Sequence, residues 1–344
     1  MTTQRRAAPT LARVAASAGV SVATVSKVLN GRADVGPATR ARVESLLAEH
    51  DYVARRAEAV AHVDEIVELV FHGPLTAYTT EILQGVLDAA GELEVSVSLS
   101  VRPRSQPGPG SRPAAWAREL ADRNRRAVID VVDDAQHGDL PALVRAGMPL
   151  VVIDPLSPPR KELASVGTTN FSGGLAATQH LLELGHRRVA YLGCDPSSAY
   201  NQARMHGFRA ACEAAGIDVP AEHLRIGSYD FAAGVAGGSA LLDLDDAPTG
   251  IFAATDEIAA GVIEAARRRG LRVPEELSVV GFDDTAVAEV LSPPLTTVCQ
   301  PLREMGRVAL RTALRLAARE QLESHHVELA TALVLRSSTA PPPR

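Results

Sequence analysis

Residues 10–53, TLARVAASAGVSVATVSKVLNGRADVGPATRARVESLLAEHDYV, hold three helical patterns in close succession. The first is an apolar stripe at helical spacing, made of Leu11, Val14, Ala15 and Ala18. Gly19 ends this helix, and Ser21 is a favourable N-cap for a second one. A third helix begins at Pro37. Two short helices joined by a glycine-containing turn are typical of the helix-turn-helix, whose second helix enters the major groove of DNA. An ordinary three-helix bundle without a DNA role is the alternative.

Charge is unevenly distributed along the chain. Residues 1–62 contain nine Arg and Lys against five Asp and Glu, whereas the whole chain of 344 residues contains 35 against 41. A basic head on an acidic body indicates that the head, and not the body, binds a polyanion.

Length and composition limit the class of protein. A chain of 344 residues is expected to form two or three domains, and its 46% hydrophobic content is enough for sizeable cores. No apolar run is long enough to span a bilayer, and the N-terminus lacks the apolar core of a signal peptide. Cys194, Cys212 and Cys299 have neither metal spacing nor a disulfide framework. We therefore expect a cytoplasmic protein without membrane contact.

Sequence signatures of enzymes are missing. The chain contains no phosphate-binding loop of the G-x-x-x-x-G-K-[ST] type, no H-E-x-x-H and no G-x-S-x-G. The pair His325 and His326 also lacks metal spacing. The expectation is a protein that is not an enzyme and that uses no cofactor, metal or catalytic residue.

The rest of the chain alternates between β-rich and helical stretches. We expect strands at 66–71, 95–101, 126–132, 149–153, 188–193, 249–253 and 277–282. We expect helices at 79–91, 172–184, 203–215 and 256–269. Such alternation favours parallel sheets with helices on both faces, and this many units exceeds one small domain. The predicted fold is therefore an all-α helix-turn-helix headpiece followed by a two-lobe α/β core.

Polar residues follow several of the expected strands. Asp154 follows the strand at 149–153, Thr255 and Asp256 follow the strand at 249–253, and Asp283 follows the strand at 277–282. In parallel sheets, ligands bind beyond the carboxyl ends of the strands, so these side chains could bind a polyhydroxylated ligand there. Arg204 could add a pair of hydrogen bonds. The alternative for Asp256 and Asp284 is that each caps the helix that follows it.

Aromatic side chains are the second expected component of a sugar site. Candidates for stacking on a sugar ring are Phe71, Tyr78, Phe171 and Tyr200.

Several short segments carry a family resemblance. The headpiece contains AGVS, ATVS and VLNG, and the body contains VVGFDD, PPLTTV and a final strand that ends in LVLRSST. Together these resemble the lactose-repressor (LacI/GalR) family of bacterial transcription regulators over nearly the whole chain. The resemblance implies a headpiece, a short hinge and an effector-binding core like that of periplasmic sugar-binding proteins. It also implies a homodimer bound to a near-palindromic operator.

The resemblance assigns roles to individual residues. Effector contacts fall at Arg204, Thr255 and Asp283, with Asp154 and Asn170 nearby. The full effector-binding set is Phe71, Tyr78, Asp154, Asn170, Phe171, Arg204, Thr255, Asp256 and Asp283. The DNA-binding set is Ser21, Val22, Ala23, Thr24, Ser26, Lys27, Asn30, Tyr52, Arg55 and Arg56. Within it, Val22 and Ala23 suit thymine methyl groups and Lys27 suits guanine, whereas Thr24, Ser26 and Asn30 suit phosphates.

The hinge departs from the family pattern. Family members commonly have Pro-Asn after the tyrosine and then a leucine that wedges into the minor groove, but here these positions are Ala54, Arg55 and Ala61. Two mechanisms stay open. Val60 or Ala61 inserts between base pairs, or Arg55 and its neighbour bind DNA through charge.

These patterns predict the division of the chain. Residues 1–8 form a flexible tail, 9–52 the headpiece, 53–64 the hinge, 65–337 the core and 338–344 a disordered tail. The two lobes of the core comprise about 65–164 with 298–326, and 165–297 with 327–337.

The predicted function is a sequence-specific DNA-binding transcription regulator of the repressor type. Its operator affinity is expected to depend on a small ligand in the cleft between the lobes. A mono- or disaccharide is favoured and a purine is the other candidate ligand. The alternative from a different class is a cytoplasmic sugar- or purine-binding protein without gene-regulatory activity.

Overall fold

A computed structural model describes residues 11–29, 35–49, 66–102, 113–132, 139–157, 161 and 163–343. The chain divides into two compact units, Met1–Glu65 and Ile66–Arg344. None of the helices in the described ranges is long and apolar enough to cross a membrane.

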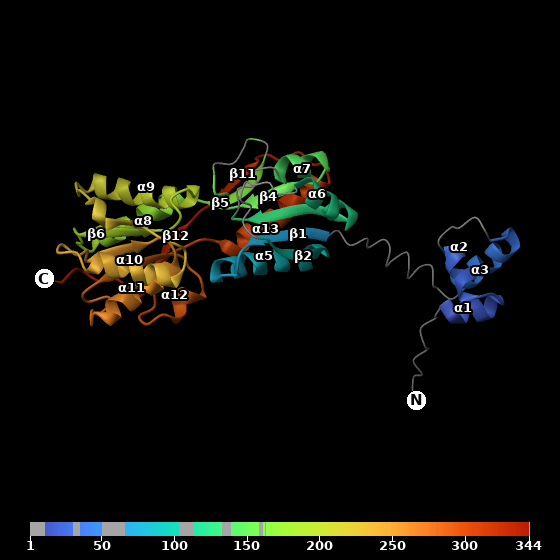
Figure 1. Ribbon diagram of the computed structural model, residues 1–344, viewed down its shortest axis with the longest axis horizontal. Helices are drawn as coiled ribbons and strands as arrows, with labels where there is room; N and C mark the ends of the chain where they lie inside the picture. The colour runs from blue at the N-terminus through green and yellow to red at the C-terminus, as the bar shows by residue number, and fades with distance from the viewer. Residues whose placement is uncertain are drawn as a thin grey trace, which may run out of the picture. The chain divides into compact units, whose positions relative to one another are not determined.

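The first unit is a small helical bundle (Figure 1). Its helices are α1 (Leu11–Ala18), α2 (Val22–Leu29) and α3 (Pro37–Glu49). Gly19 adopts a φ of +64°, a conformation that glycine reaches without strain, and so turns the chain between α1 and α2. The Ser21 Oγ accepts the Thr24 backbone N–H at 3.1 Å and caps α2. The buried core consists of Val14, Ala15, Ala18, Val25, Val28, Val43 and Leu47. The predicted three-helix headpiece is confirmed.

The first lobe of the second unit is built around a six-stranded parallel sheet. Its strands are β1 (Ile66–His72), β2 (Ser96–Arg102), β3 (Arg125–Val131), β4 (Leu150–Ile153), β5 (Ala164–Thr168) and β11 (His326–Leu329), in the order β11-β5-β4-β3-β1-β2. Helices α5 (Ala77–Leu93) and α13 (Leu302–Ala317) pack on one face. Helices α6 (Pro113–Asp122) and α7 (Asp139–Arg145) pack on the other.

The second lobe repeats this arrangement. Its strands are β6 (Val189–Gly193), β7 (Leu224–Ile226), β8 (Gly250–Ala253), β9 (Ser278–Asp283), β10 (Thr296–Cys299) and β12 (Ala332–Val334), in the order β12-β10-β9-β8-β6-β7. In this sheet β12 pairs antiparallel with β10. Figure 1 shows α8 (Asn170–Glu183) and α9 (Ala199–Ala214) on one side, and α10 (Phe231–Leu242) and α11 (Asp256–Arg268) on the other. The short helices are η1 (Ala221–His223) and α12 (Ala286–Val290). The predicted two-lobe α/β core is confirmed.

The predicted lobe boundaries need correction. Strands β5 and β11 pair with each other and belong to the first sheet, whereas β10 belongs to the second. The chain therefore leaves the first lobe near Thr169 and not at 164, re-enters it at Gln300, and leaves it again near Ala330 and not at 326. The pairing partners of these short strands lie far away in the sequence, so local periodicity did not locate them.

The predicted disordered tail is also wrong, because residues 338–340 lie against the second lobe. Ser338 is buried, and its Oγ accepts the Thr296 backbone N–H at 2.8 Å and donates to the Val279 carbonyl at 2.6 Å. The Ala340 carbonyl accepts a hydrogen bond from the Ser278 hydroxyl at 2.9 Å. Polar and backbone groups thus hold this segment, which has no apolar pattern that would have predicted order.

Glycines let pairs of helices approach closely around the core. A methyl group on Gly174 of α8 would overlap the backbone of Arg204, and one on Gly207 of α9 would overlap the backbone of Phe171. The same reciprocal arrangement joins α5 to α13 through Gly85 and Gly306, and α10 to α11. The close α8–α9 contact fixes the position of Arg204.

Candidate functional site

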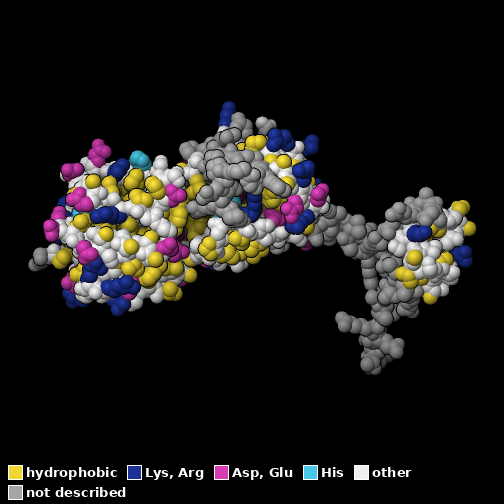
Figure 2. All heavy atoms as spheres, in the orientation of Figure 1, with side chains coloured by type: hydrophobic (Ala, Val, Ile, Leu, Met, Phe, Trp, Pro, Cys, Tyr) yellow, Lys and Arg dark blue, Asp and Glu magenta, His cyan; other side chains and the backbone are white. Residues whose placement is uncertain are grey.

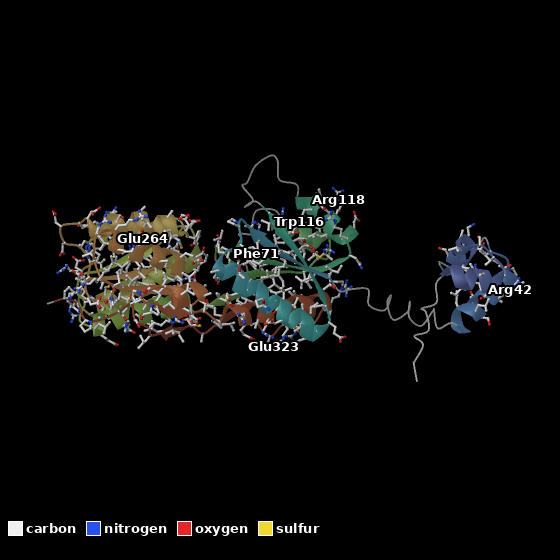
Figure 3. All side chains as sticks on the ribbon, turned by 90° about the horizontal axis from the view of Figure 1, so that it is seen from below. Arg42, Phe71, Trp116, Arg118, Glu264 and Glu323 are labelled. Atoms are coloured by element: carbon white, nitrogen blue, oxygen red, sulfur yellow. The ribbon has the colours of Figure 1, made fainter. Side chains whose placement is uncertain are left out.

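Helix α2 carries the candidate DNA-binding surface of the headpiece. Val25 and Val28 are buried, whereas Val22, Ala23 and Lys27 are exposed on the opposite face. Thr24 and Ser26 are half-buried and Ser21 is exposed. Arg42 is exposed on the neighbouring α3 (Figure 3). Asn30, Tyr52, Arg55 and Arg56 lie outside the described residues. The solvent face of α2 therefore has the predicted composition, and its contacts to DNA remain a prediction.

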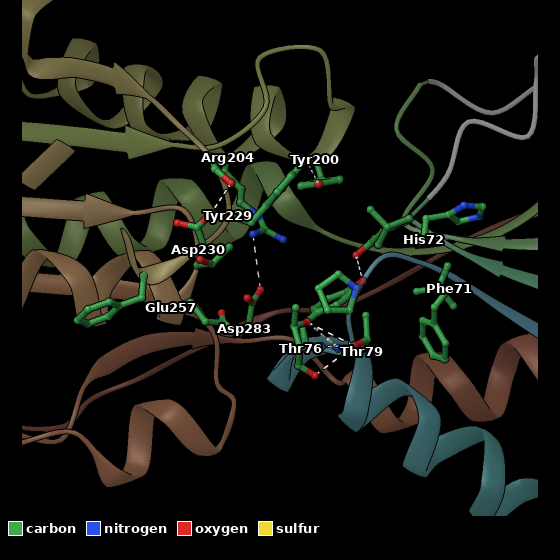
Figure 4. Close-up of a pocket in the computed structure, with 18 residues that line it drawn as sticks. Phe71, His72, Thr76, Thr79, Tyr200, Arg204, Tyr229, Asp230, Glu257 and Asp283 are labelled. Carbon is green, nitrogen blue, oxygen red and sulfur yellow. Dashed lines mark hydrogen bonds and ion pairs between the residues drawn. The ribbon is translucent and has the colours of Figure 1, made fainter. Parts of the chain in front are cut away.

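The core contains a cavity of about 610 Å³, lined by both lobes (Figure 4). This volume is within the usual range for small-molecule sites. The first lobe contributes Phe71, His72, Pro74, Thr76, Tyr78, Thr79, Val131, Val132 and Asp154. The second contributes Tyr200, Arg204, Ser228, Tyr229, Asp230, Phe231, Thr255, Glu257 and Asp283. Strands β1, β3, β4, β8 and β9 all end at this cavity, as expected for parallel sheets.

Arg204 is the central cation of the cavity wall. Its side chain is only 2% exposed, and its guanidinium carbon lies 3.7 Å from the centre of the Phe282 ring. The Nε donates to the Asn170 side-chain oxygen at 2.8 Å, and one terminal nitrogen lies 3.6 Å from the Asp283 carboxylate. These contacts hold the planar guanidinium in one orientation, with a carboxylate beside it.

Two buried carboxylates accompany Arg204. The Asp283 carboxylate accepts a hydrogen bond from the Gln300 side-chain nitrogen at 2.6 Å. Asp154 accepts one from the Tyr78 hydroxyl at 2.5 Å. Burial raises the pKa of Asp283 well above its ordinary value and raises the pKa of Asp154, while the positive charge of Arg204 opposes both shifts.

Backbone strain coincides with this site. Asp154, Asp283 and Val132 adopt φ angles of 46°, 116° and 55° at the ends of their strands. Such values are uncommon for side chains other than glycine, and least common for a β-branched residue. Positive-φ residues are retained where the surrounding structure holds them, often at binding sites.

A closed ring of polar contacts joins the pocket to the segments that connect the lobes. Asn170 donates to the Thr168 carbonyl at 3.1 Å, and the Thr168 hydroxyl donates to the Gln300 side chain at 2.5 Å. Gln300 in turn holds Asp283, which pairs with Arg204, which returns to Asn170. Thr168 and Asn170 flank the first of the chain segments that connect the two lobes, and Gln300 lies in the second of these segments.

Six predicted effector-binding residues line the cavity. These are Phe71, Tyr78, Asp154, Arg204, Thr255 and Asp283. Tyr200, the other predicted aromatic, also lines it, and its hydroxyl donates to that of Tyr229 at 2.6 Å. Asn170 lies behind Arg204 and positions it. Contact of these residues with a ligand remains a prediction.

Besides Asn170, two predicted residues do not line the cavity. Phe171 is 45% exposed on α8 and is absent from the lining. Asp256 is fully buried on the other side of α11, where it accepts hydrogen bonds from Thr285 at 2.7 Å and from Thr297 at 2.6 Å. Phe171 lies in the first turn of α8, and Asp256 is the first residue of α11. Each helix directs the side chain away from the cavity.

The capping alternative is wrong as well. The hydroxyl of Thr255 caps α11 by accepting the Ile258 backbone N–H at 3.1 Å, and Thr285 occupies the N-cap of α12. Asp284 pairs with Arg336 at 2.7 Å.

Several lining residues were missed. Asp230 is the N-cap of α10 and Glu257 lies in the first turn of α11. Burial raises the pKa of Glu257, and interactions with backbone N–H groups, including that of Ala77 at the start of α5, oppose the rise. An acidic residue at a helix start is an ordinary cap, so sequence alone gave no reason to single these out.

The chain is similar to known proteins over nearly its whole length. Residues 10–54 match the bacterial regulatory proteins of the lacI family, and residues 178–339 match the periplasmic binding protein-like domain. The chain is 34% identical over 343 residues to the HTH-type transcriptional regulator CelR of Thermobifida fusca, with 97% of this chain and 99% of CelR covered.

Solved structures give the same result. A CelR–cellobiose complex is similar with a TM-score of 0.73 and 32% identity, and the match covers 96% of this chain and 99% of that chain. A lac repressor dimer bound to operator and the anti-inducer ONPF is similar with a TM-score of 0.72 and 27% identity, over 97% of this chain and 100% of the other.

A helix-turn-helix headpiece followed by a two-lobe, periplasmic-binding-protein-like core defines a class of DNA-binding transcription regulators. The chain belongs to the lacI family of bacterial regulatory proteins. It is a sequence-specific transcription regulator and not an enzyme, and the alternative of a binding protein without gene-regulatory activity is not favoured.

Proposed function

We propose that this regulator is a cytoplasmic repressor that binds a near-palindromic operator as a homodimer and responds to a small sugar bound between its lobes. The observation that carries the sugar assignment is the buried group formed by Arg204 and Asp283 of the second lobe and Asp154 of the first, all in the cavity lining. A fixed guanidinium and two carboxylates provide donors and acceptors in the directions that neighbouring hydroxyl groups require.

The headpiece supports the operator assignment. The exposed face of α2 combines two small apolar side chains with Lys27, which suits reading of thymine methyl groups and guanine in the major groove. One headpiece covers only a half-site, so two copies are needed for a near-palindromic operator. Because its target is chromosomal DNA, we place the protein in the cytoplasm.

An apolar surface on the first lobe supports the homodimer. Figure 2 shows hydrophobic side chains gathered over α5. Exposed large apolar residues on α5 and the edge strand β2 are Leu87, Leu93, Leu99 and Val101. A second copy would cover this surface, which is costly to leave in water.

A gel shift with the DNA upstream of the chain's own operon tests the proposal. The protein is expected to shift this DNA, and one member of a panel of monosaccharides, disaccharides and purines is expected to change the affinity. A ligand at 100 times its dissociation constant should also raise stability by about 2.7 kcal/mol. If only a purine acts, the sugar assignment is wrong. If neither the protein alone nor the protein with any member of the panel shifts the DNA, the assignment of this DNA as operator fails.

Adjacent aspartates provide a matched pair of variants. Asp283→Asn removes the charge that faces Arg204 in the cavity and is expected to abolish the effector response while operator binding persists. Asp284→Asn alters a carboxylate that pairs with Arg336 outside the cavity, and both activities are expected to persist. A normal effector response in Asp283→Asn would contradict the site assignment.

A further inference from the structure

The exposed part of the cavity differs in chemistry from its buried part. The buried part consists of Arg204, Asp154 and Asp283. The exposed part is formed by the loop 228–231, which leads from β7 into α10, together with Thr76 at the start of α5. Figure 4 shows Asp230 and Tyr229 on one side of the cavity and Thr76 on another. A ligand that fills both parts must therefore be longer than a ligand that contacts only the buried group.

Phe231 is the apolar feature of the exposed part. Its side chain is 46% exposed at the cavity wall, whereas four of the other phenylalanines, Phe71, Phe208, Phe252 and Phe282, are at most 1% exposed. Phe171 is exposed to the same extent, at 45%, but lies on α8 outside the cavity lining. Of these two exposed phenylalanines, Phe231 alone lines the cavity, so a ligand there would remove its apolar surface from water, which is favourable in proportion to the area covered.

Negative charge is the polar feature of the exposed part. The Asp230 carboxylate accepts the Ala233 backbone N–H at 2.8 Å and the Ser228 hydroxyl at 2.9 Å, and these hydrogen bonds lower the pKa of Asp230. Asp230 is therefore ionised at neutral pH. Glu257 adds a second carboxyl group to the same lobe.

Cations are scarce in comparison. Among the described residues of the lining, Arg204 is the only Arg or Lys, and it is engaged by Asp283 and Asn170. His72, also in the lining, is paired with Asp130 at 2.7 Å. A phosphate group on the ligand would thus meet carboxylates in place of the arginine cluster that usually binds it.

We propose that the effector is an uncharged or positively charged saccharide of at least two rings, with one ring held by Arg204 and Asp283 and the next ring lying against Phe231. This inference rests on the proposed sugar-dependent regulation and adds the length and the charge of the sugar. The two rings occupy the buried and the exposed parts of the cavity. Asp230 accepts a hydrogen bond from a hydroxyl or ammonium group of the second ring.

Calorimetric titration of the full-length protein tests the length of the ligand. The probes are cellobiose, maltose, lactose and trehalose, with glucose and galactose as the single-ring sugars. We expect one disaccharide to bind at least about ten-fold more tightly than its component sugars. Phe231→Ala should lower the affinity for that disaccharide by roughly ten-fold and leave the single-ring affinity within about two-fold. The matched control, Phe171→Ala, should change neither affinity.

The charge of the ligand is tested with the 6-phosphate of the disaccharide that binds. This probe is expected to bind at least about ten-fold more weakly than the parent sugar. Asp230→Asn should reduce that difference, and it keeps the helix cap because asparagine caps helices as well as aspartate does. Equal affinity for the phosphorylated and the parent sugar in the wild-type protein would overturn the charge assignment.

The possible failures are distinguishable. If no sugar of either length binds and none changes operator affinity, the proposed function fails. If glucose or galactose binds as tightly as every disaccharide, or if Phe231→Ala lowers the affinities for one-ring and two-ring sugars equally, sugar regulation survives and the two-ring inference is wrong.

Discussion

Lys27 is the one lysine or arginine of α2, and its side chain is exposed beside Val22 and Ala23. A lysine in this position can donate to the O6 and N7 of a guanine. We expect Lys27→Ala to weaken specific operator binding by about 1–3 kcal/mol and to relax the preference at one base pair in each half-site. Gel shifts with a set of single-base operator variants measure both effects. Arg42→Ala on α3 is the control, and should leave the base preference unchanged.

A uniform loss of affinity for all sequences in Lys27→Ala would show that Lys27 contacts phosphate. The residue would then position the headpiece without reading the sequence.

Asp256 gives the fold a pH dependence of defined sign. Burial raises its pKa from 3.8 to about 7. Because the folded state binds this proton more tightly than the unfolded chain, the stabilisation is complete below about pH 3.8 and is lost as the pH rises through about 7. In Asp256→Asn, the unfolding free energy should fall less steeply with pH between pH 5 and 7 than in the wild type. The difference in slope is expected to reach up to about 1.4 kcal/mol per pH unit.

Urea unfolding at several pH values provides the measurement for Asp256→Asn. An asparagine amide can accept from Thr285 and donate to the Thr297 hydroxyl, so the variant keeps its partners. Asp284→Asn at the neighbouring strand end serves as the comparison. An unchanged pH slope in Asp256→Asn would mean that the buried carboxylate stays ionised over this range.

Residues of the site differ in how far the sequence predicted them. Asp154 and Asp283 were found because parallel strands bring their carboxyl ends to one rim. Asp256 satisfies the same rule, and Phe171 was chosen as an aromatic side chain, but both face away, since the rotation of a helix about its axis depends on packing that the sequence does not display. Phe231 was missed because a single exposed phenylalanine has no pattern around it.

At the scale of secondary-structure elements, the contact between α8 and α9 determines where Arg204 lies. A methyl group on Gly174 would overlap the carbonyl oxygen, the carbonyl carbon and the Cα of Arg204. These are backbone atoms, so they cannot rotate away. Gly174→Ala should therefore destabilise the core by about 1–3 kcal/mol and weaken sugar binding by shifting the guanidinium. Urea unfolding and calorimetric titration measure the two effects.

Gly91 in α5 provides the matched control, because a methyl group there meets no atom within 4 Å. Gly91→Ala should leave sugar binding unchanged and leave stability equal or up to about 1 kcal/mol higher, since alanine is the better helix former. Equal stability losses in the two variants would contradict the overlap argument.

Elements were predictable where the pattern was local. The seven strands expected from β-rich runs all occur, within a residue or two at their ends, because each run is apolar and bounded by turns. The missed strands β5, β7, β10 and β11 have only three to five residues, and they depend on distant partners for their hydrogen bonds. The order of residues 338–340 has the same origin, since buried polar contacts with β9 and β10 hold them.

At the scale of the whole molecule, ligand and operator must act on each other through the core. The ring of contacts through Thr168, Gln300, Asp283, Arg204 and Asn170 touches the cavity and two of the segments that connect the lobes. A sugar that binds Arg204 and Asp283 changes the partners available to Gln300 and Asn170. The ring is therefore a physical path by which occupancy of the cavity can alter the relation between the lobes.

Gln300→Met tests this path, because methionine keeps the volume of the side chain and loses both hydrogen bonds. Leaving buried Asp283 and Thr168 without this partner should cost about 1–3 kcal/mol of stability. Sugar and operator should still bind separately, but the factor by which sugar changes operator affinity should fall towards one. By linkage, the factor by which operator changes sugar affinity must fall equally, so measuring both checks the result. Gln84→Met, on the surface of α5, should keep the wild-type factor. A folded Gln300→Met protein with the wild-type factor would show that the lobes are coupled by another route.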